Sequence, residues 1–257
     1  MINFTEKKLH NLDSGYSIFG EDIPLLPTTI ENQDDAKSWV VSFPILKKLM
    51  DEYFSVHSKT EREFQQVVAR VNNYSPISNA SEYFISDIEV TDSNFSPRFD
   101  MTAIRWLAGN QRKSGNNCKA ALIEMKYGDG ALKGKAGLLK HLEDAHELIS
   151  NKEQYAKLIA NMESQFIQLD QLGLLNFNKG TSQAKIRLDS NINPEVIFIL
   201  ADHNPRTTPL KDILMDPKLD EYENLKLFDL RFFVASFSGY GLHTKCMLSL
   251  SEFRELL

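Results

Sequence analysis

Cysteine is scarce in this chain of 257 residues, which has only Cys118 and Cys246, far apart in the sequence. Two isolated cysteines argue against a disulfide framework or a cysteine-rich zinc site, and they favour a reducing compartment. No apolar run approaches the length that is needed to cross a membrane. The first ten residues contain no long apolar region and no cleavage-like site, so we expect a cytoplasmic protein without a signal peptide.

Several motifs with a known chemistry are also missing. The chain has no G-x-x-x-x-G-K-[ST] phosphate loop, no G-x-S-x-G nucleophile elbow and no paired C-x-x-C. It has no internal repeat and no low-complexity segment. The chemistry must therefore come from side chains that the fold brings together.

The charge is distributed unevenly. The whole chain has a net charge of −6, yet residues 93–140 hold nine basic residues against three acidic ones, which makes this segment +6 and the remainder −12. Concentrated positive charge suits a phosphodiester substrate. The alternative is a solvated hairpin that happens to be basic. The nine basic residues are Arg98, Arg105, Arg112, Lys113, Lys119, Lys126, Lys133, Lys135 and Lys140.

Hydrophobic periodicity predicts an α/β protein that forms a single domain. Residues 1–58 form an N-terminal extension, with helices within 34–53 that Pro44 interrupts. The core, residues 59–204, has a helix, three meander strands, a helix pair and a buried strand. Residues 205–257 add a short helix and a hairpin. The predicted elements are helices at 60–72, 136–150, 151–172 and 210–215, and strands at 83–90, 98–107, 119–127, 195–201, 228–237 and 242–250.

Two acids lie on neighbouring strands of this core. If the strands 98–107 and 119–127 pair, Asp100 and Glu124 lie side by side at one end of the sheet. Alternation puts Glu124 and Lys126 on one face and Met125 on the other. Two adjacent carboxylates repel unless a cation joins them, and hard oxygen ligands suit Mg²⁺ or Mn²⁺. Lys126 could reach over the same face toward a phosphate or a water.

The arrangement Asp100…Glu124-x-Lys126 resembles the active-site signature of the PD-(D/E)XK nuclease superfamily, over residues 60–204. Phe99 stands where the proline of that signature is usual. The resemblance implies a restriction-endonuclease-like αβββαβ core with a mixed sheet, and a metal-dependent nuclease that hydrolyses DNA. It also implies that Asp100, Glu124 and the backbone carbonyl of Met125 bind Mg²⁺ or Mn²⁺, and that Lys126 positions the water or stabilises charge.

The helix at 60–72 opens with Glu61-Arg62-Glu63-Phe64. This is similar to the Glu-Arg-Glu-apolar pattern of archaeal Holliday-junction resolvases, which implies that Glu61 completes the metal shell. The alternative is that Glu61 only complements the helix dipole.

DNA is the expected partner, and a homodimer is compatible with cutting two strands. Six basic residues are predicted to contact nucleic acid: Arg98, Arg105, Arg112, Lys113, Lys133 and Lys135.

Three histidines could be considered for a catalytic or metal-binding role, but the sequence does not favour such a role for them. Members of the superfamily with a further motif on the helix at 136–150 place a Gln or a basic residue there, and His141 is one of several available substitutes. His141 and His146 are five residues apart, so they do not form an i, i+4 zinc pair. We interpret both as structural, and we interpret His203 as part of a turn.

Two alternatives to a nuclease stay open. The first is a catalytically inactive module of the same fold that binds nucleic acid or a protein partner, and it differs from an enzyme in needing no metal. The second is an unrelated α/β protein whose hairpin carries an accidental E-x-K, and carboxylates of Asp100 and Glu124 that lie far apart would favour it.

Overall fold

A computed structural model describes residues 26–57, 60–76, 78, 80–90, 98–108, 118–134, 136–177, 186–203, 207–235 and 239–257. The chain divides into two compact units, Met1–Lys59 and Thr60–Leu257. In the described part of the chain, no helix combines the length and the apolar character needed to span a membrane.

The described part of the first unit contains one helix, α2 (Gln33–Val56), which runs through Pro44. The predicted interruption at Pro44 is therefore wrong. A proline inside a helix removes one backbone hydrogen bond. The length of this helix, 24 residues, and its N-cap offset that loss. Asn32 caps it by accepting hydrogen bonds from the amides of Asp34 and Asp35 at 2.9 and 3.0 Å.

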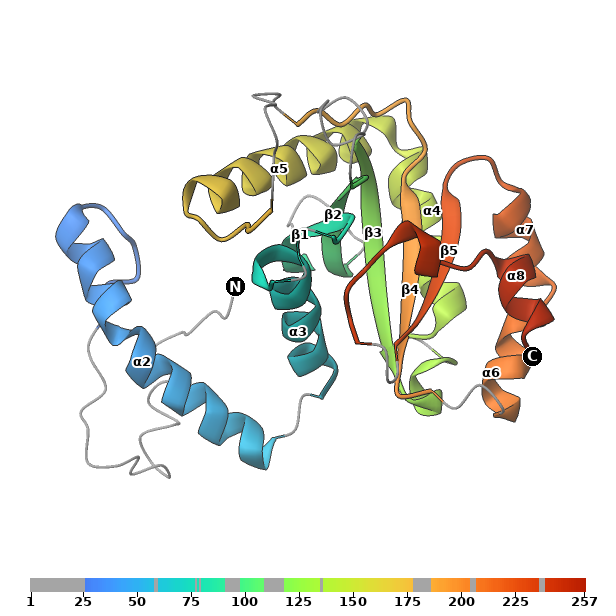
Figure 1. The fold of residues 1–257 in the computed structure, drawn as a ribbon, viewed down its shortest axis with the longest axis horizontal. Coiled ribbons are helices and arrows are strands. Elements are labelled where there is room, and N and C mark those ends of the chain that lie inside the picture. Colours follow the sequence, from blue (N-terminus) through green and yellow to red (C-terminus); the bar gives the residue numbers. More distant parts are fainter. Residues whose placement is uncertain are drawn as a thin grey trace. The chain divides into compact units, whose positions relative to one another are not determined.

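The second unit is built on a mixed sheet of five strands in the order β1-β2-β3-β4-β5. β1, β2 and β3 form an antiparallel meander, whereas β3, β4 and β5 are parallel. Figure 1 shows β3 and β4 in the middle of the sheet. The strands are β1 (Tyr83–Val90), β2 (Phe99–Trp106), β3 (Cys118–Tyr127), β4 (Glu195–Ala201) and β5 (Asp229–Ala235).

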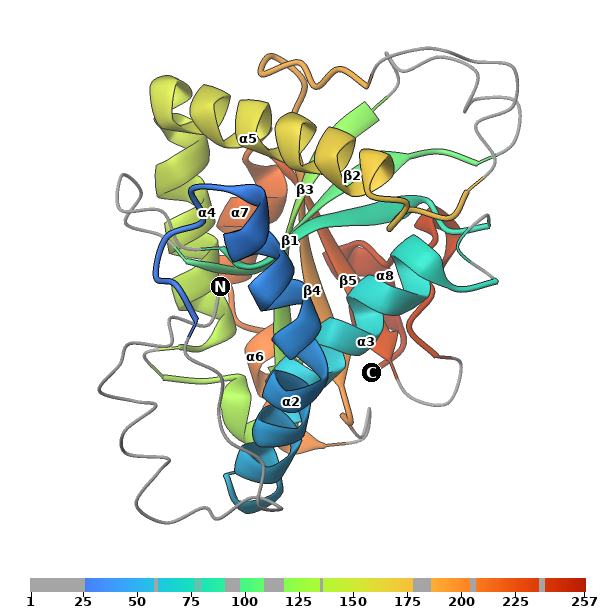
Figure 2. The same cartoon turned by 90° about the vertical axis from the view of Figure 1, so that its left-hand side faces the viewer.

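Helices cover both faces of this sheet (Figures 1 and 2). One face packs against α4, α5, α6, α7 and α8. The other packs against Val68 of α3 and against Leu242 and Met247 near the C-terminus. The fold class is therefore α/β, as predicted. The helices are α3 (Thr60–Tyr74), α4 (Leu138–Ser150), α5 (Lys152–Gln171), α6 (Thr208–Leu214), α7 (Lys218–Asn224) and α8 (Leu250–Glu255).

The parallel strands are connected through helices, as parallel pairing requires. The connection from β3 to β4 passes through α4 and α5, which meet at Asn151. The side chain of Asn151 accepts a hydrogen bond from the amide of Gln154 at 3.2 Å and so caps α5. Every residue of β4 is buried, which explains its uninterrupted apolar run from Val196 to Ala201.

The predicted C-terminal hairpin is not observed. β5 pairs in parallel with β4, and the returning segment joins it only through an isolated antiparallel bridge between Phe232 and Leu248. Residues 244–246 form a 3₁₀ turn and α8 follows. The apolar residues of 242–250 therefore pack on the sheet without becoming a strand of it.

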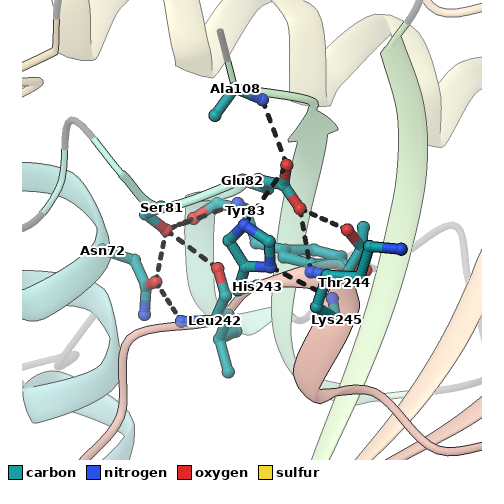
Figure 3. Close-up of polar contacts among 9 residues, drawn as sticks. All are labelled: Asn72, Ser81, Glu82, Tyr83, Ala108, Leu242, His243, Thr244 and Lys245. Carbon is teal, nitrogen blue, oxygen red and sulfur yellow. Dashed lines mark hydrogen bonds and ion pairs between the residues drawn. The ribbon is translucent and has the colours of Figure 1, made fainter.

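A buried polar network holds the returning segment against α3 and β1 (Figure 3). Asn72 is fully buried. Its amide nitrogen donates to the carbonyls of Val68 and Tyr240 at 2.8 and 2.7 Å. Its oxygen accepts from the hydroxyl of Ser81 and the amide of Leu242 at 2.5 and 2.7 Å. One side chain therefore joins a helix, the start of β1 and a segment about 170 residues away in the sequence.

We expect Asn72→Ala to lower the free energy of unfolding by about 3 kcal/mol, because it leaves several buried polar groups without a partner. Urea unfolding followed by circular dichroism measures the change. Arg70→Ala, an exposed position on the same helix, is the control and should change stability by less than about 0.5 kcal/mol. Equal stability of the two variants would contradict this role for Asn72.

Candidate metal and phosphate site

The site forms where β2 and β3 separate. Their backbone pairing extends to Met101 opposite Ile123. Two residues further along β3, the amide of Met125 donates to Oδ2 of Asp100 at 2.8 Å, so a side chain replaces the backbone of β2 as its partner. This hydrogen bond fixes the Asp100 carboxyl beside the end of β3. The two acids are therefore brought together, and the separation that would have favoured an unrelated α/β protein is not observed for this pair.

The backbone of Met125 faces the same gap. In a strand, the N–H and C=O of one residue point to the same edge, as the paired exchange of hydrogen bonds in an antiparallel ladder requires. Because the Met125 amide points toward Asp100, its carbonyl points to the β2 side as well. This orientation is compatible with the predicted role of the carbonyl as a metal ligand.

The predicted alternation along β3 is observed. Met125 packs in the cluster on the α3 side of the sheet, whereas Ala120 and Leu122 pack in the cluster on the α4 side. Alternate residues of a strand share a face, so Glu124 and Lys126 lie on the same face as Ala120 and Leu122. They therefore face α4.

Glu124 is buried without hydrogen-bond partners of normal geometry. Its side chain is 1% exposed, and its Oε2 lies 3.2 Å from Nδ1 of His141 and 3.5 Å from Nζ of Lys126. Among the described residues, neither oxygen of Glu124 accepts a hydrogen bond of acceptable angle. A buried polar atom without a partner is costly. This cost is consistent with a ligand that completes the site.

Burial also changes the protonation of the two acids. Burial and the neighbouring Glu124 carboxyl raise the pKa of Asp100 to about 7. Burial raises the pKa of Glu124 to about 7 as well, although the ammonium of Lys126 opposes this shift. The two groups interact, so they titrate as a pair. In the absence of a cation the protein therefore disfavours two negative charges at this position.

Lys126 and His141 close the α4 side of the site. Nζ of Lys126 lies 3.0 Å from Nε2 of His141, which also lies 3.2 Å from the carbonyl of Ala136. If Lys126 donates to Nε2, then Nδ1 carries the proton of a neutral ring and points it toward Glu124. Burial and the Lys126 ammonium lower the pKa of His141, which favours the neutral ring.

Glu61 belongs to the same end of the sheet. Burial and the charge of Asp100 raise its pKa, whereas the charges of Lys126 and His141 lower it. The first turn of α3, which holds Glu61, therefore contributes a third acid to the surroundings of the pair.

His203 fixes the main chain behind Lys126. Its ring is fully buried, and its Nε2 lies 3.1 Å from the carbonyl of Lys126. The other ring nitrogen lies 3.1 Å from Oδ1 of Asp129, which follows β3. The end of β4 and the turn after β3 are thereby joined at the residue that presents the lysine.

The residues predicted to contact nucleic acid lie in different places. Arg98 is exposed, next to the site, and forms an ion pair with Glu89. Arg105 is at the other end of β2, where its guanidinium lies 3.0 Å from the buried carboxylate of Glu195. It therefore has a structural partner away from the site. Lys133 is exposed and lies 3.4 Å from Asp212. The remaining three, Arg112, Lys113 and Lys135, lie outside the described residues.

The donors at this site fit a hard divalent cation. Among the described residues, no group of three or more His, Cys, Asp or Glu side chains has a metal-binding arrangement. Mg²⁺ does not need such a group, because it is commonly held by one or two carboxylates together with waters and substrate oxygens. Catalytic zinc usually has three protein ligands. The paired acids and the unpartnered oxygens of Glu124 therefore fit Mg²⁺ or Mn²⁺ better than Zn²⁺.

The sequence singled out neither histidine of the site. His141 was one of several residues available for the site-facing position on its helix, and its partners are on β3. His203 was interpreted as a turn residue, yet it contacts the carbonyl of Lys126. Only the predicted strand order, which brings the ends of β3 and β4 together, could have indicated these contacts.

Comparisons of this chain with protein-family models, with curated proteins and with solved structures found no match.

Proposed function

We propose that this protein is a metal-dependent nuclease that hydrolyses phosphodiester bonds of DNA. The observation that carries the proposal is the buried pair of Asp100 and Glu124, held at the end of β3 with Lys126 on the same face. Such a pair costs stability unless it binds a cation. Strained or costly groups of this kind are characteristic of functional sites.

The architecture supports the same proposal. A helix, an antiparallel meander, a helical connection and a parallel strand follow one another in the chain. This is the αβββαβ order expected of a restriction-endonuclease-like core. The acids and the lysine lie on the second and third strands, where the PD-(D/E)XK signature requires them.

Asp100, Glu124 and the carbonyl of Met125 would hold Mg²⁺ or Mn²⁺, with Glu61 nearby. A divalent cation supplies Lewis-acid stabilisation of a phosphoryl oxygen and lowers the pKa of water. The protein contributes fixed ligands: the Met125 amide orients Asp100, and burial excludes water from Glu124. Because the carboxyl pKa values are about 7, the ionised pair becomes available near neutral pH.

Lys126 would stabilise negative charge on the phosphoryl group or orient the attacking water. Its side chain is 5% exposed, so its charge acts in a poorly hydrated environment. His141 is a positioning residue in this proposal. It accepts a hydrogen bond from Lys126 and so determines where the ammonium lies relative to Glu124.

The test is cleavage of supercoiled plasmid and of labelled oligonucleotides, with Mg²⁺ or Mn²⁺ and with EDTA. We expect cleavage by the wild-type protein with metal, none with EDTA, and none by Asp100→Asn. Single-stranded, double-stranded and branched DNA, together with RNA, identify the substrate form. Glu143→Gln, an exposed acid on α4, is the control for removing one carboxylate and should cleave normally.

An inactive wild-type protein on all of these substrates would overturn the proposal. If it also failed to bind metal, a nuclease-fold module that binds nucleic acid or a protein partner would remain. Cleavage that persists in Asp100→Asn would place the activity elsewhere in the chain or in a contaminant.

A further inference from the structure

Two arginines share one carboxylate beside the acid pair. Glu89, near the end of β1, forms ion pairs with Nη2 of Arg62 at 3.3 Å and with Nη2 of Arg98. Arg62 comes from α3 and Arg98 immediately precedes β2. Three different elements therefore meet at Glu89.

The position of Glu89 links this cluster to the site. Its neighbours Ile88 and Val90 pair with Met101 and Phe99, which are the residues on either side of Asp100. The charge of Glu89 also contributes to the raised pKa of Glu61. The two guanidiniums are thus held at the edge of the acid pair, on the side where β1 ends and β2 begins.

The backbone of Glu89 is in an unusual conformation. Its φ is +56°, in the left-handed region that residues other than glycine rarely adopt. Such a conformation persists only where the surroundings fix it, and it is concentrated at functional sites. A glycine would adopt it at lower cost. The glutamate instead keeps a carboxylate between two arginines.

The charge of the cluster is not balanced internally. One carboxylate between two guanidiniums leaves a net charge of +1, and the side chains of Arg98 and Arg62 are 63% and 32% exposed. Each guanidinium has five N–H donors, and the ion pairs with Glu89 are made through Nη2 of each. Oriented guanidinium donors at a surface match the geometry of a phosphate group.

We infer that Arg62 and Arg98, oriented by Glu89, bind a phosphate of the nucleic-acid strand next to the phosphate at the acid pair. This inference rests on the proposed nuclease function and specifies how its substrate is held. Glu89 is a positioning residue, since it fixes both guanidiniums and would not itself contact a phosphate. The cluster would recognise the backbone of the strand and not its sequence.

The test is the salt dependence of binding by fluorescence anisotropy, with a labelled oligonucleotide, in EDTA so that no cleavage occurs. Each phosphate neutralised in duplex DNA contributes about −0.9 to the slope of log affinity against log salt concentration. We expect Arg62→Gln/Arg98→Gln, which removes the contacts to one phosphate, to reduce the steepness of the slope by about 0.9 and to weaken binding about 10-fold at about 0.1 M salt. Arg62→Lys/Arg98→Lys should keep most of the slope.

Arg70→Gln/Arg187→Gln, which removes two exposed positive charges elsewhere, is the matched control and should leave the slope within about 0.5 of wild type. If the cluster were only structural, Arg62→Gln/Arg98→Gln would lower thermal stability while slope and affinity matched those of the control. That result would overturn the inference, and metal-dependent cleavage by the wild-type protein would still support the proposed function. Failure of the wild-type protein to bind or cleave any nucleic acid would overturn both.

Discussion

Lys126→Ala is expected to lower the rate of DNA cleavage at saturating substrate by about 10²- to 10³-fold. The ammonium is 5% exposed and lies 3.5 Å from Glu124, so water cannot replace it easily when the side chain is removed. A positive group that acts on developing charge in a poorly hydrated site supplies several kcal/mol to the transition state. Single-turnover cleavage measures this loss without a contribution from product release.

Two further variants separate the chemical role of Lys126 from effects on folding. Lys140→Ala removes an exposed lysine from α4 and should leave the rate within about twofold of wild type. Lys126→Arg keeps the charge but replaces a compact ammonium by a larger planar group, so we expect little recovery of the rate. Normal cleavage by a correctly folded Lys126→Ala protein would contradict the role assigned to this residue.

The second large effect concerns stability and pH. The pKa values of Asp100 and Glu124 are about 7 in the folded protein, whereas in unfolded chains such carboxyls have pKa values near 4. Between about pH 4 and pH 7 the folded state therefore binds more protons than the unfolded state. The free energy of unfolding must then fall as the pH rises through this range. The stabilisation is fully present below the unfolded pKa and is lost above the folded pKa.

The expected loss for the metal-free protein between about pH 4 and about pH 8 is at least on the order of 4 kcal/mol, which is the contribution of one carboxyl whose pKa is raised by about 3 units at about 1.4 kcal/mol per unit. Urea unfolding at several pH values in EDTA measures it. Mg²⁺ prefers the ionised pair, so adding it above pH 7 should restore much of the stability. Asp100→Asn should show a flatter profile, whereas Glu143→Gln should follow wild type. A metal-free protein whose stability is constant or rises from about pH 5 to about pH 8 would contradict the account.

The strands could be predicted from the sequence because their burial is reflected in local patterns. β1 and β4 have the predicted bounds, β2 is one residue shorter than predicted at each end, and β3 begins one residue earlier than predicted. β4 is apolar from Val196 to Ala201 because both of its faces are covered. The alternation along β3 also predicted correctly that Met125 lies on the opposite face from Glu124 and Lys126.

The C-terminal part was harder to predict because its packing depends on distant segments. A glycine-containing turn at 238–241 suggested an antiparallel hairpin, but β5 completes the parallel part of the sheet. α7 was missed, since it buries only Leu219 and therefore has no apolar stripe. In α2, the interruption was predicted from Pro44 alone, although the residues around it have a helical pattern and the helix continues through the proline.

The acid pair could be predicted from the sequence, but its surroundings could not. Asp100 and Glu124 lie on consecutive strands, and the antiparallel pairing of these two strands brings them together. His141, His203 and Glu89 reach the site or its edge from elements whose positions depend on the whole fold. Their side chains carry no local pattern that distinguishes a contact of this kind from an ordinary surface or turn residue.

The central claim is that the pair of Asp100 and Glu124 exists to bind a divalent cation. Calorimetric titration of the wild-type protein with Mn²⁺ near pH 7, in two buffers of different ionisation enthalpy, tests it most directly. The account predicts saturable binding with release of protons, because the carboxyls are partly protonated before the cation enters. Asp100→Asn should abolish the binding, and Glu143→Gln should not. Absence of binding by the wild-type protein, or equal binding by Asp100→Asn, would contradict the claim.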